Sequence, residues 1–399
     1  MAMPGVRCPL RRSVGRGRRV ARALASAGRR SVRAHWSCHA DRPPSRLVRP
    51  GRPASRSGPG GAAMSGDRRL GVALCGLGML SEHQIAPALE KTRHCRLAGL
   101  VSGSPDKVAR FQARYGVPDD AVYGYHNMAR MADNPDIDIV YVVTPNALHA
   151  DHAIAAARAG KHVFCEKPLE VSVERCQAMI DACREAGTLL GTAYRCHYDP
   201  HHVECIRLAR ERVFGAPVVV QAAFSIDVGR ADQWRLRHAL AGGGALVDVG
   251  IYALQASRYL TGEEPVEVSA MASITDAEKY AEVDETLVWT ARFPSGVLAH
   301  CATSFRAGGM QSLRVDCERG WFELDPAFFY DGNHGRRSDG VEIRHPPTDL
   351  FAAELDDFAL SILEGRPARL PGEEGLRDVR IMQAIYEAAR TGRRVRLGG

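Results

Sequence analysis

The chain has 399 residues, of which 45% are hydrophobic, and this is enough to bury two sizeable cores. The formal net charge is +7, but residues 1–63 hold 15 of the 53 lysines and arginines and only one acid, Asp41. From residue 64 onward, 38 basic side chains stand against 45 acidic ones, a net charge of −7. This balance disfavours a protein that binds nucleic acid through a basic face.

Residues 1–63 are rich in Arg, Ser, Pro, Gly and Ala and have no helical or strand periodicity. We expect this leader to be disordered or to precede a true start at Met64, although an Arg-rich, acid-poor leader also resembles an organelle transit peptide. Twin-arginine export is disfavoured, because no apolar run of signal-peptide length follows Arg29-Arg30.

The cysteines and the hydropathy bear on the compartment. The eleven cysteines form no CxxC pair, and Cys75, Cys165 and Cys183 lie inside apolar runs, which indicates buried thiols in a reducing compartment. No apolar stretch reaches the roughly 20 residues of a membrane span. We therefore expect a cytoplasmic protein with no membrane partner, and we consider periplasmic export the less favoured alternative.

Strand and helix patterns alternate through the first half of the chain. An alternation of this kind is typical of repeated βα units in a parallel, doubly wound sheet. We therefore expect an α/β fold whose first domain, residues 64–195, is a Rossmann domain. The predicted strands are 71–75, 97–101, 137–143, 162–165 and 189–193, and the predicted helices between and after them include 107–115, 147–159 and 173–186.

The turn after the first strand reads Gly76-Leu77-Gly78-Met79-Leu80-Ser81. Its two glycines match the dinucleotide fingerprint, in which a tight turn is followed by a position without Cβ where pyrophosphate approaches a helix amino terminus. Ser81 stands in place of the third glycine, so the motif alone is weak. The βα alternation around it favours a cofactor site.

The second strand ends in Ser102-Gly103-Ser104, with Lys107 one turn further on. A site that prefers NAD normally has an acid here to hold the ribose hydroxyls. Hydroxyls, free backbone N–H groups and a cation suit a 2′-phosphate instead, so we expect NADP. The alternative is an ordinary polar loop.

Two further strand ends carry polar residues at the ligand side of the predicted sheet. Pro145-Asn146, with His149 nearby, follows the strand at 137–143; Asn146 can also simply cap the next helix. Glu166-Lys167-Pro168 follows the strand at 162–165. Lys167 can bond a cofactor ribose or a substrate hydroxyl there, and its charge can lower the pKa of a neighbouring phenol. The alternative is a surface lysine before a turn.

The second domain, residues 196–399, has a different pattern. Period-2 strands joined by short turns predict an α+β domain with an open, mostly antiparallel sheet. Two amphipathic helices close the chain, the first with Phe351, Leu355, Phe358 and Ile362 on one face and the second around 379–389. The predicted strands are 218–226, 266–274, 286–293, 297–305, 312–317 and 321–324.

A glycine-rich turn, 242–244, precedes a predicted helix that carries Asp248 and Tyr252. The glycines allow close approach of backbone to a ligand, and the i, i+4 spacing places the carboxylate and the phenol on one face. A phenol has a pKa near about 10, so Tyr252 needs a nearby cation such as Lys167 to act as a base. An amphipathic helix with a half-buried tyrosine explains the pattern equally well.

Residues 196–205 hold two cysteines and three histidines, but their spacing matches no structural zinc site. We expect no metal and interpret the segment as a polar helix start after Asp199-Pro200.

Together these motifs resemble the Gfo/Idh/MocA oxidoreductase family, and within it the branch of glucose-fructose and aldose-aldose oxidoreductases. The resemblance runs from about residue 70 to 396, and Tyr252, where many members have histidine, is typical of that branch. The segments that carry it are 76–78, 100–103, 145–149, 166–168, 194–200, 234–237, 242–252 and 371–375.

The resemblance implies NADP between the two domains, a homodimer or homotetramer formed through the second sheet, and a sugar substrate. It implies that Tyr252 and Lys167 are catalytic and that Asp248 supports them. It implies oxidation of a cyclic aldose at C1 to the lactone, with a second sugar reduced by NADPH that stays bound. The alternatives are an aldose or dihydrodiol dehydrogenase that releases NADPH, and a non-catalytic NADP sensor. The predicted cofactor contacts are Gly76, Leu77, Gly78, Met79, Ser102, Gly103, Ser104, Lys107, Tyr125, Pro145, Asn146, His149, Glu166, Lys167, Arg195, Trp234 and Arg235.

Overall fold

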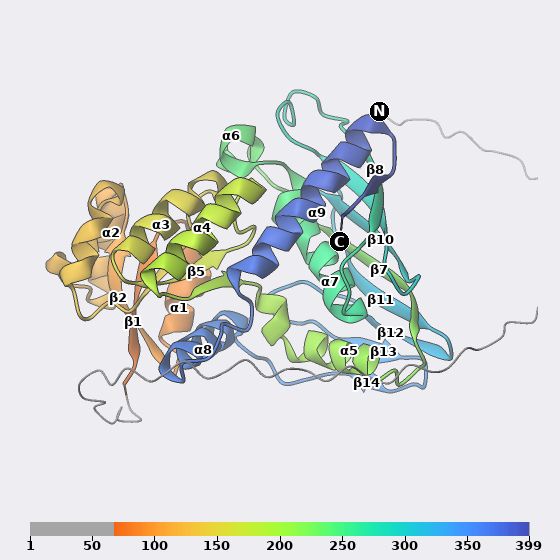
Figure 1. Ribbon diagram of the computed structural model, residues 1–399, viewed down its shortest axis with the longest axis horizontal. Coiled ribbons are helices and arrows are strands. Elements are labelled where there is room, and N and C mark those ends of the chain that lie inside the picture. Colours follow the sequence, from red (N-terminus) through yellow and green to blue (C-terminus); the bar gives the residue numbers. More distant parts are fainter. Residues whose placement is uncertain (1–67, 399) are drawn as a thin grey trace, which may run out of the picture. The chain divides into compact units, whose positions relative to one another are not determined.

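The computed structural model describes residues 68–398, which form two β-sheets with helices against them (Figure 1). The predicted leader, residues 1–63, lies outside the described residues. The elements are β1 (Leu70–Cys75), η1 (Ser81–Ile85), α1 (Ala86–Leu89), β2 (Cys95–Val101), α2 (Pro105–Tyr115), η2 (Asp119–Ala121), β3 (Val122–Tyr123), η3 (Tyr125–Asp133), β4 (Ile139–Val142), η4 (Asn146–Leu148), α3 (His149–Arg158), β5 (His162–Glu166), α4 (Val173–Ala186), β6 (Leu190–Ala193), η5 (Arg195–Tyr198), α5 (Pro200–Arg210), β7 (Pro217–Ser225), η6 (Trp234–Leu236), α6 (His238–Ala241), η7 (Leu246–Gly250), α7 (Ile251–Thr261), β8 (Glu267–Ser273), β9 (Thr286–Arg292), β10 (Leu298–Ser304), β11 (Gln311–Cys317), β12 (Gly320–Leu324), β13 (Gly335–Arg337), β14 (Glu342–Ile343), α8 (Leu350–Leu363), α9 (Gly372–Thr391) and β15 (Val395–Arg396).

The first sheet has six strands in the order β3-β2-β1-β4-β5-β6, all parallel. In β1, Val72 and Leu74 face one core, and Ala73 and Cys75 face the other. All four are fully buried, because α1, α2 and α8 cover one face and α3 and α4 cover the other (Figure 1). The predicted doubly wound parallel sheet is confirmed.

Helix α8 belongs to the second segment of the chain but packs on this first sheet. The rings of Phe358 in α8 and Phe164 in β5 stack with centroids 4.8 Å apart. The helix was predicted from its apolar face, but a single division at residue 195 does not account for its position. The division into 64–195 and 196–399 stays a prediction about sequence segments, because a helix from the second segment completes the first layer.

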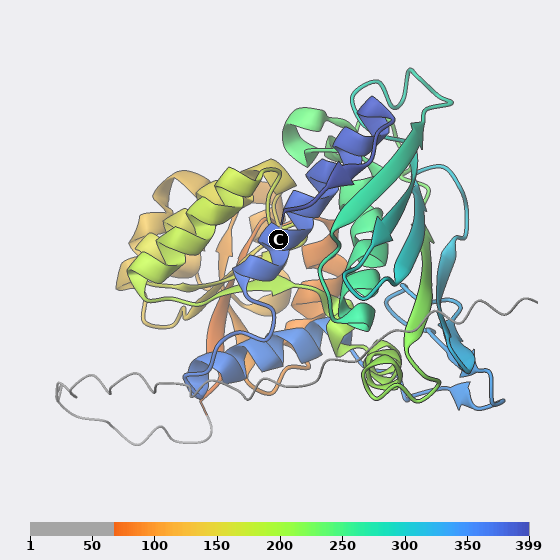
Figure 2. The same cartoon turned by 45° about the vertical axis from the view of Figure 1, so that its right-hand side comes forward.

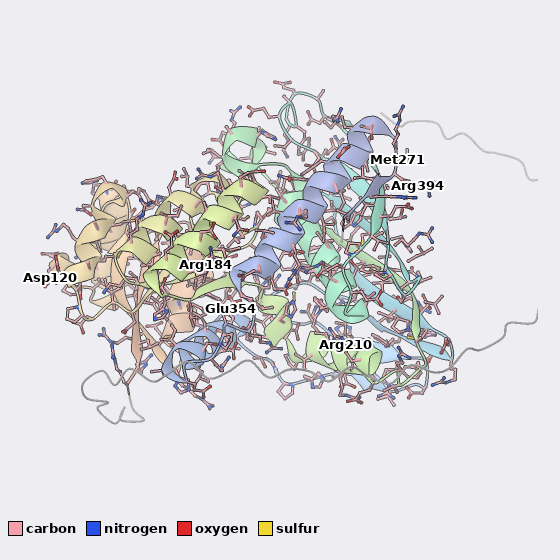
Figure 3. All side chains as sticks on the ribbon, viewed as in Figure 1. Asp120, Arg184, Arg210, Met271, Glu354 and Arg394 are labelled. Atoms are coloured by element: carbon pink, nitrogen blue, oxygen red, sulfur yellow. The ribbon has the colours of Figure 1, made fainter. Side chains whose placement is uncertain are left out.

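The second sheet has nine strands in the order β14-β13-β12-β11-β7-β10-β9-β8-β15. Among its described pairs, β7 and β10 run parallel and the others antiparallel, which confirms the predicted mostly antiparallel sheet. Leu287 and Trp289 of β9 are buried on the face that carries α7 and α9 (Figure 2). On the opposite face, Val288 is 45% exposed and Met271 of β8 is 74% exposed (Figure 3).

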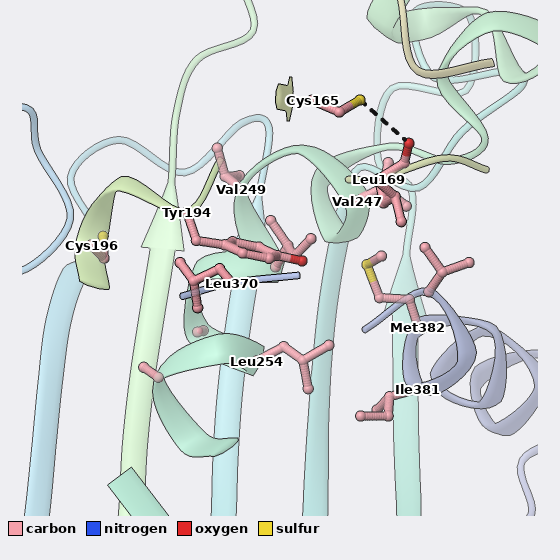
Figure 4. Close-up of a cluster of buried hydrophobic side chains, with 14 of the residues drawn as sticks. Cys165, Leu169, Tyr194, Cys196, Val247, Val249, Leu254, Leu370, Ile381 and Met382 are labelled. Atoms are coloured by element: carbon pink, nitrogen blue, oxygen red, sulfur yellow. Dashed lines mark hydrogen bonds between the residues drawn. The ribbon is translucent and has the colours of Figure 1, made fainter. Parts of the chain in front are cut away.

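One hydrophobic core joins the two layers. Leu169 and Tyr194, which follow the ends of β5 and β6, belong to the same buried cluster as Val247 of η7 and Met382 of α9 (Figure 4). These residues come from loops of the first sheet and from helices that pack on the second sheet. Their packing therefore fixes the carboxyl edge of the first sheet against those helices.

One stretch of the described residues, His238–Thr261, is long and apolar enough to cross a membrane, because 18 consecutive residues within it have a mean hydropathy of 1.3. Since 72% of those 18 residues are buried inside the fold, the stretch has the character of a core helix and is weak evidence for a membrane span.

Candidate active site

The carboxyl edge of the first sheet faces the start of α7. Lys167 directly follows β5, Arg195 lies just beyond β6, and η7 and α7 bring Asp248 and Tyr252 to the same place. The structure therefore brings together the three predicted catalytic residues, from segments about 80 positions apart in the sequence.

Lys167 and Asp248 form a direct pair. The Lys167 ammonium donates to the backbone oxygen of Asp248 at 2.7 Å and lies 3.4 Å from its carboxylate oxygen Oδ1. The other carboxylate oxygen, Oδ2, accepts from Nε of Arg235 at 3.0 Å. The guanidinium of Arg235 lies over the ring of Trp234, 4.7 Å from its centroid. Asp248 is thus held between two cations.

This arrangement sets the charge of Asp248. Burial alone would raise the pKa of the carboxyl, but the cations of Arg235 and Lys167 outweigh burial, so the pKa of Asp248 lies below its usual value. Asp248 is therefore an anion at neutral pH and cannot serve as a general acid there.

Tyr252 is bonded to the other cation of the site. Nε of Arg195 donates to the Tyr252 hydroxyl at 3.2 Å, and the guanidinium carbon lies 4.7 Å from the centroid of the ring. The Lys167 ammonium lies 5.0 Å from the same centroid. Lys167, the cation expected near the phenol, therefore lies beside its ring and bonds Asp248, while Arg195 is the cation that bonds the hydroxyl.

Burial is the largest influence on the phenol. It raises the pKa of Tyr252 well above its usual value, and the Arg195 cation only partly opposes that rise. In the described residues alone, Tyr252 is therefore protonated at neutral pH. To act as a base it needs a further influence, such as the positive charge of a bound cofactor or the proton shift of a bound substrate.

A loop that the sequence did not single out completes this side of the site. The backbone oxygens of Phe328 and Phe329 accept from the Arg195 guanidinium at 2.6 and 2.9 Å. The ring of Tyr330 lies 4.6 Å from the same guanidinium, and 47% of the residue is exposed. The segment carries no motif; its only signal was a run of three aromatic residues between two turns.

The fingerprint turn fits a dinucleotide. Gly76 has a φ of +99°, and a Cβ there would lie 2.9 Å from the backbone oxygen of Val143. A Cβ on Gly78 would meet nothing within 4 Å, so this position is open to a ligand. Leu77 is buried and Met79 is 78% exposed. Ser81, in place of the third glycine, donates its hydroxyl to the Gly76 oxygen at 2.6 Å and so stabilises the turn.

The end of β2 gathers several predicted cofactor residues. The Ser102 hydroxyl oxygen accepts from the backbone N–H of Ser104 at 3.1 Å. We had expected this N–H to be free to bind a phosphate, and it is not. The Tyr125 ring borders Gly103, with its nearest atom 3.5 Å from where a Cβ would stand, and stacks on His152. Lys107 is exposed on α2. The hydroxyls, the aromatic ring and the cation fit an adenosine 2′-phosphate.

The loop at the end of β4 is held by hydrogen bonds from two buried side chains, Asn146 and His149. Asn146 is buried and donates its amide to the oxygen of Ala241 at 2.8 Å, so it ties the loop to α6 and does not cap the helix that follows Pro145. His149 is buried, and its ring nitrogens lie 2.8 Å from the oxygen of Thr144 and 3.1 Å from that of Pro168. His149 therefore positions the loop beside Lys167.

We had expected the glycine turn at 242–244 to allow close approach of a ligand, and the structure shows other neighbours there. A Cβ on Gly243 would lie 2.2 Å from the Tyr386 hydroxyl, and one on Gly244 would lie 2.0 Å from the backbone oxygen of Asp284. These glycines make room for the protein's own chain, not for a ligand. No periodicity could have shown this, because the neighbours lie about 40 and 140 residues further on.

The histidines and cysteines of 196–205 serve other contacts. His197 pairs with Gln255 at 3.0 Å, His201 with Asp199 at 2.7 Å, and His202 lies between Tyr259 and the oxygen of Ala327. Over residues 68–398, no group of three or more His, Cys, Asp or Glu side chains is arranged to hold a metal ion.

A dinucleotide cradle with a lysine, a carboxylate and a phenol at its edge defines an NAD(P)-dependent oxidoreductase. The chain belongs to the Gfo/Idh/MocA oxidoreductase family. Residues 70–194 match the family model described as an oxidoreductase family with an NAD-binding Rossmann fold, and residues 202–323 match the model of its C-terminal domain. The predicted family is thus confirmed.

Two curated relatives and one solved structure illustrate the likeness. The crystal structure of aldose-aldose oxidoreductase from Caulobacter crescentus, complexed with glycerol, is 43% identical, has a TM-score of 0.80 and aligns over 83% of this chain and 100% of that one. D-xylose 1-dehydrogenase [NADP(+)] from Haloarcula marismortui is 33% identical over 83% of this chain and 94% of its own. D-xylose 1-dehydrogenase (NADP(+)) 2 from Haloferax volcanii is 33% identical over 82% and 98%.

Proposed function

We propose that the protein oxidises a cyclic aldose at C1 to the lactone. This refines a coarser statement: the chain is an NADP-dependent oxidoreductase of the family that acts on the CH–OH groups of sugars. The observation that carries the refinement is the group of Tyr252, Arg195, Lys167 and Asp248 at the edge of the cofactor cradle.

Each of these residues has a role in the proposal. The Tyr252 phenol first releases its own proton to solvent, and the N–H of Arg195 that bonds its oxygen stabilises the resulting phenolate, which then takes the proton of the anomeric hydroxyl. Lys167, held by Asp248, binds a sugar hydroxyl and adds positive charge beside the phenol. NADP, when bound, supplies the acceptor for the hydride that leaves C1.

The residues at the end of β2 support the choice of NADP. Ser102, Tyr125 and Lys107 would hold the 2′-phosphate, and no acid stands at that strand end to repel it. Gly76 and Gly78 would admit the pyrophosphate.

Two modes of turnover remain within the proposal. In one, NADPH stays bound and reduces a second sugar, such as fructose or another aldose. In the other, NADPH leaves after each cycle, as in an ordinary aldose or dihydrodiol dehydrogenase.

The experiment is a substrate panel with product analysis. Purified protein is given NADP or NAD with D-glucose, D-xylose or a trans-dihydrodiol, and lactone is trapped with hydroxylamine. We expect lactone from an aldose and a preference for NADP. Turnover of the dihydrodiol alone, or a sugar product oxidised at a carbon other than C1, would overturn the proposal.

The assembly and the compartment also remain proposals. The uncovered face of the second sheet, with Val288, Leu298 and Met271 exposed, would join two copies into a homodimer or a homotetramer. The buried thiols of the described residues support the cytoplasm. Sedimentation of the purified protein tests the assembly, since a monomer would contradict it.

A further inference from the structure

Directly behind the catalytic edge, one phenol lies between two buried carboxyl groups. The hydroxyl of Tyr141 in β4 lies 2.9 Å from Oε1 of Glu166 and 3.2 Å from Oε1 of Glu354. Tyr141 and Glu354 are 0% exposed and Glu166 is 7% exposed. Glu354 belongs to α8, whose other buried side chains are mostly apolar (Figure 3).

Tyr141, Glu166 and Glu354 need two protons between them to make both of these contacts hydrogen bonds. A phenol has one proton and can donate it to one acceptor only, whereas two ionised carboxylates offer acceptors alone. If both glutamates were ionised, one of the two contacts with Tyr141 would be a lone pair facing a lone pair, with two like charges buried together. A second proton is therefore held on one of the carboxyl groups.

The surroundings decide which carboxyl group holds it. Glu166 accepts the backbone N–H of Lys167 at 3.2 Å and is followed directly by that cation. Glu354 has no such donor: its Oε2 is buried without a hydrogen-bond partner among residues 68–398. An unpaired carbonyl oxygen of a neutral acid costs far less than an unpaired oxygen of a carboxylate.

The electrostatic directions agree with this geometry. Burial raises the pKa of both carboxyls; Lys167 opposes the rise for Glu166, whereas the charge of Glu166 adds to it for Glu354. Other titratable side chains that interact electrostatically with the pair are Arg195, Asp349, Tyr198, Tyr252, Tyr330, Cys165 and Cys196.

We propose that Glu354 is a neutral carboxylic acid that donates a hydrogen bond to the Tyr141 oxygen, and that through Tyr141 it positions the Glu166 carboxylate beside Lys167. The Tyr141 hydroxyl is then free to donate to Glu166, and a single negative charge lies behind the catalytic lysine. Glu354 touches neither sugar nor cofactor in this proposal, so it is a positioning residue.

The test is infrared spectroscopy of the carboxyl carbonyl stretch at neutral pH, on protein without sugar or cofactor. We expect a protonated-carboxyl band in the wild type that disappears in Glu354→Gln. The control is Glu364→Gln, which changes an exposed glutamate at the end of the same helix and should leave the band in place. Glu354→Met gives the same readout if the Gln variant does not fold.

Two results would overturn the proposal: no protonated-carboxyl band in the wild type, or a band that survives in the Glu354 variants and disappears in Glu166→Gln. A kinetic readout follows, and it depends on the proposed function. Glu354→Met, which cannot donate, should lower kcat by up to about tenfold and shift its pH profile, while Glu354→Gln, which can donate, should restore the profile. Because the spectrum needs no turnover, failure of the sugar assignment would not be confused with failure of this inference.

Discussion

Lys167 and Arg195, two of the cations of the candidate site, are held in opposite ways. Lys167 lies against a carboxylate, Asp248, which it shares with Arg235. Arg195 lies against a phenol, Tyr252. Two of its other N–H groups donate to the backbone oxygens of Phe328 and Phe329. Lys167 is thus paired with an anion, whereas the groups that accept hydrogen bonds from Arg195 are neutral.

The difference explains the charge states on the two sides. Arg235 and Lys167 together keep the pKa of Asp248 below its usual value in spite of burial. One cation does not prevent burial from raising the pKa of Tyr252. The lysine side is therefore fixed in charge and suited to positioning, whereas the arginine side retains a proton that can move.

The largest effect is expected from Tyr252→Phe. Removing the hydroxyl removes the group that takes the substrate proton, so kcat should fall by about 10³–10⁴ while NADP affinity stays the same. Steady-state kinetics and a binding titration measure the two quantities.

The matched control for this change is Tyr115→Phe. Tyr115 lies on α2, and its hydroxyl is buried without a hydrogen-bond partner in the part of the chain that the structure describes. If both variants kept wild-type kcat, Tyr252 would not be the base.

A smaller loss is expected from Asp248→Asn. The change removes the charge that holds Lys167 and Arg235, but the Asp248 backbone oxygen still accepts from the lysine at 2.7 Å. We expect kcat to fall by roughly 10², from misplacement of Lys167. Asp232→Asn is the control, since that carboxylate is exposed and pairs with Arg230. A loss as large as that of Tyr252→Phe would contradict a merely supporting role.

Arg195→Gln tests the other side through pH. Because the pKa of Tyr252 is raised, its base form is scarce at neutral pH, and the rate of oxidation should increase as the pH rises. Arg195 opposes that rise in pKa, so its removal should move the ascending limb of the kcat/KM profile to higher pH. At neutral pH we expect a loss of about tenfold for each unit of displacement. A limb that moved to lower pH would refute the assignment of Arg195.

The smallest effect is expected at the cofactor. Ser102→Asp places a carboxylate at the end of β2, where it should repel a 2′-phosphate and hold ribose hydroxyls. We expect a rise in the Kd of NADP of about 10- to 100-fold, with a smaller change for NAD. The ratio of the two constants is its own control, and an unchanged ratio would mean that the 2′-phosphate binds elsewhere.

Local patterns accounted for the first sheet better than for the site. The βα alternation predicted the strands within one or two residues, because each strand is buried on both faces and bounded by turns. The two-residue β3 was missed, since it is too short for any periodicity. The lysine, the carboxylate and the phenol were found because they lie in segments with a recognisable motif.

The rest of the site depends on contacts between distant segments. Arg195 bonds backbone oxygens that lie more than 130 residues away, and backbone oxygens leave no trace in side-chain chemistry. Glu354 occupies the apolar face of α8 as a single acid, which an amphipathic pattern treats as an exception. Only the packing of α8 on the first sheet places it beside Tyr141.

The central claim is that this site oxidises an aldose with NADP, and an absorbance spectrum tests it most directly. Extensively desalted protein is scanned before and after addition of D-glucose or D-xylose, first alone and then with NADP. We expect the band of the reduced nicotinamide to grow with sugar: without added NADP if the cofactor is retained, and only with it if the cofactor is released. No growth under either condition, with protein that binds NADP, would contradict the account.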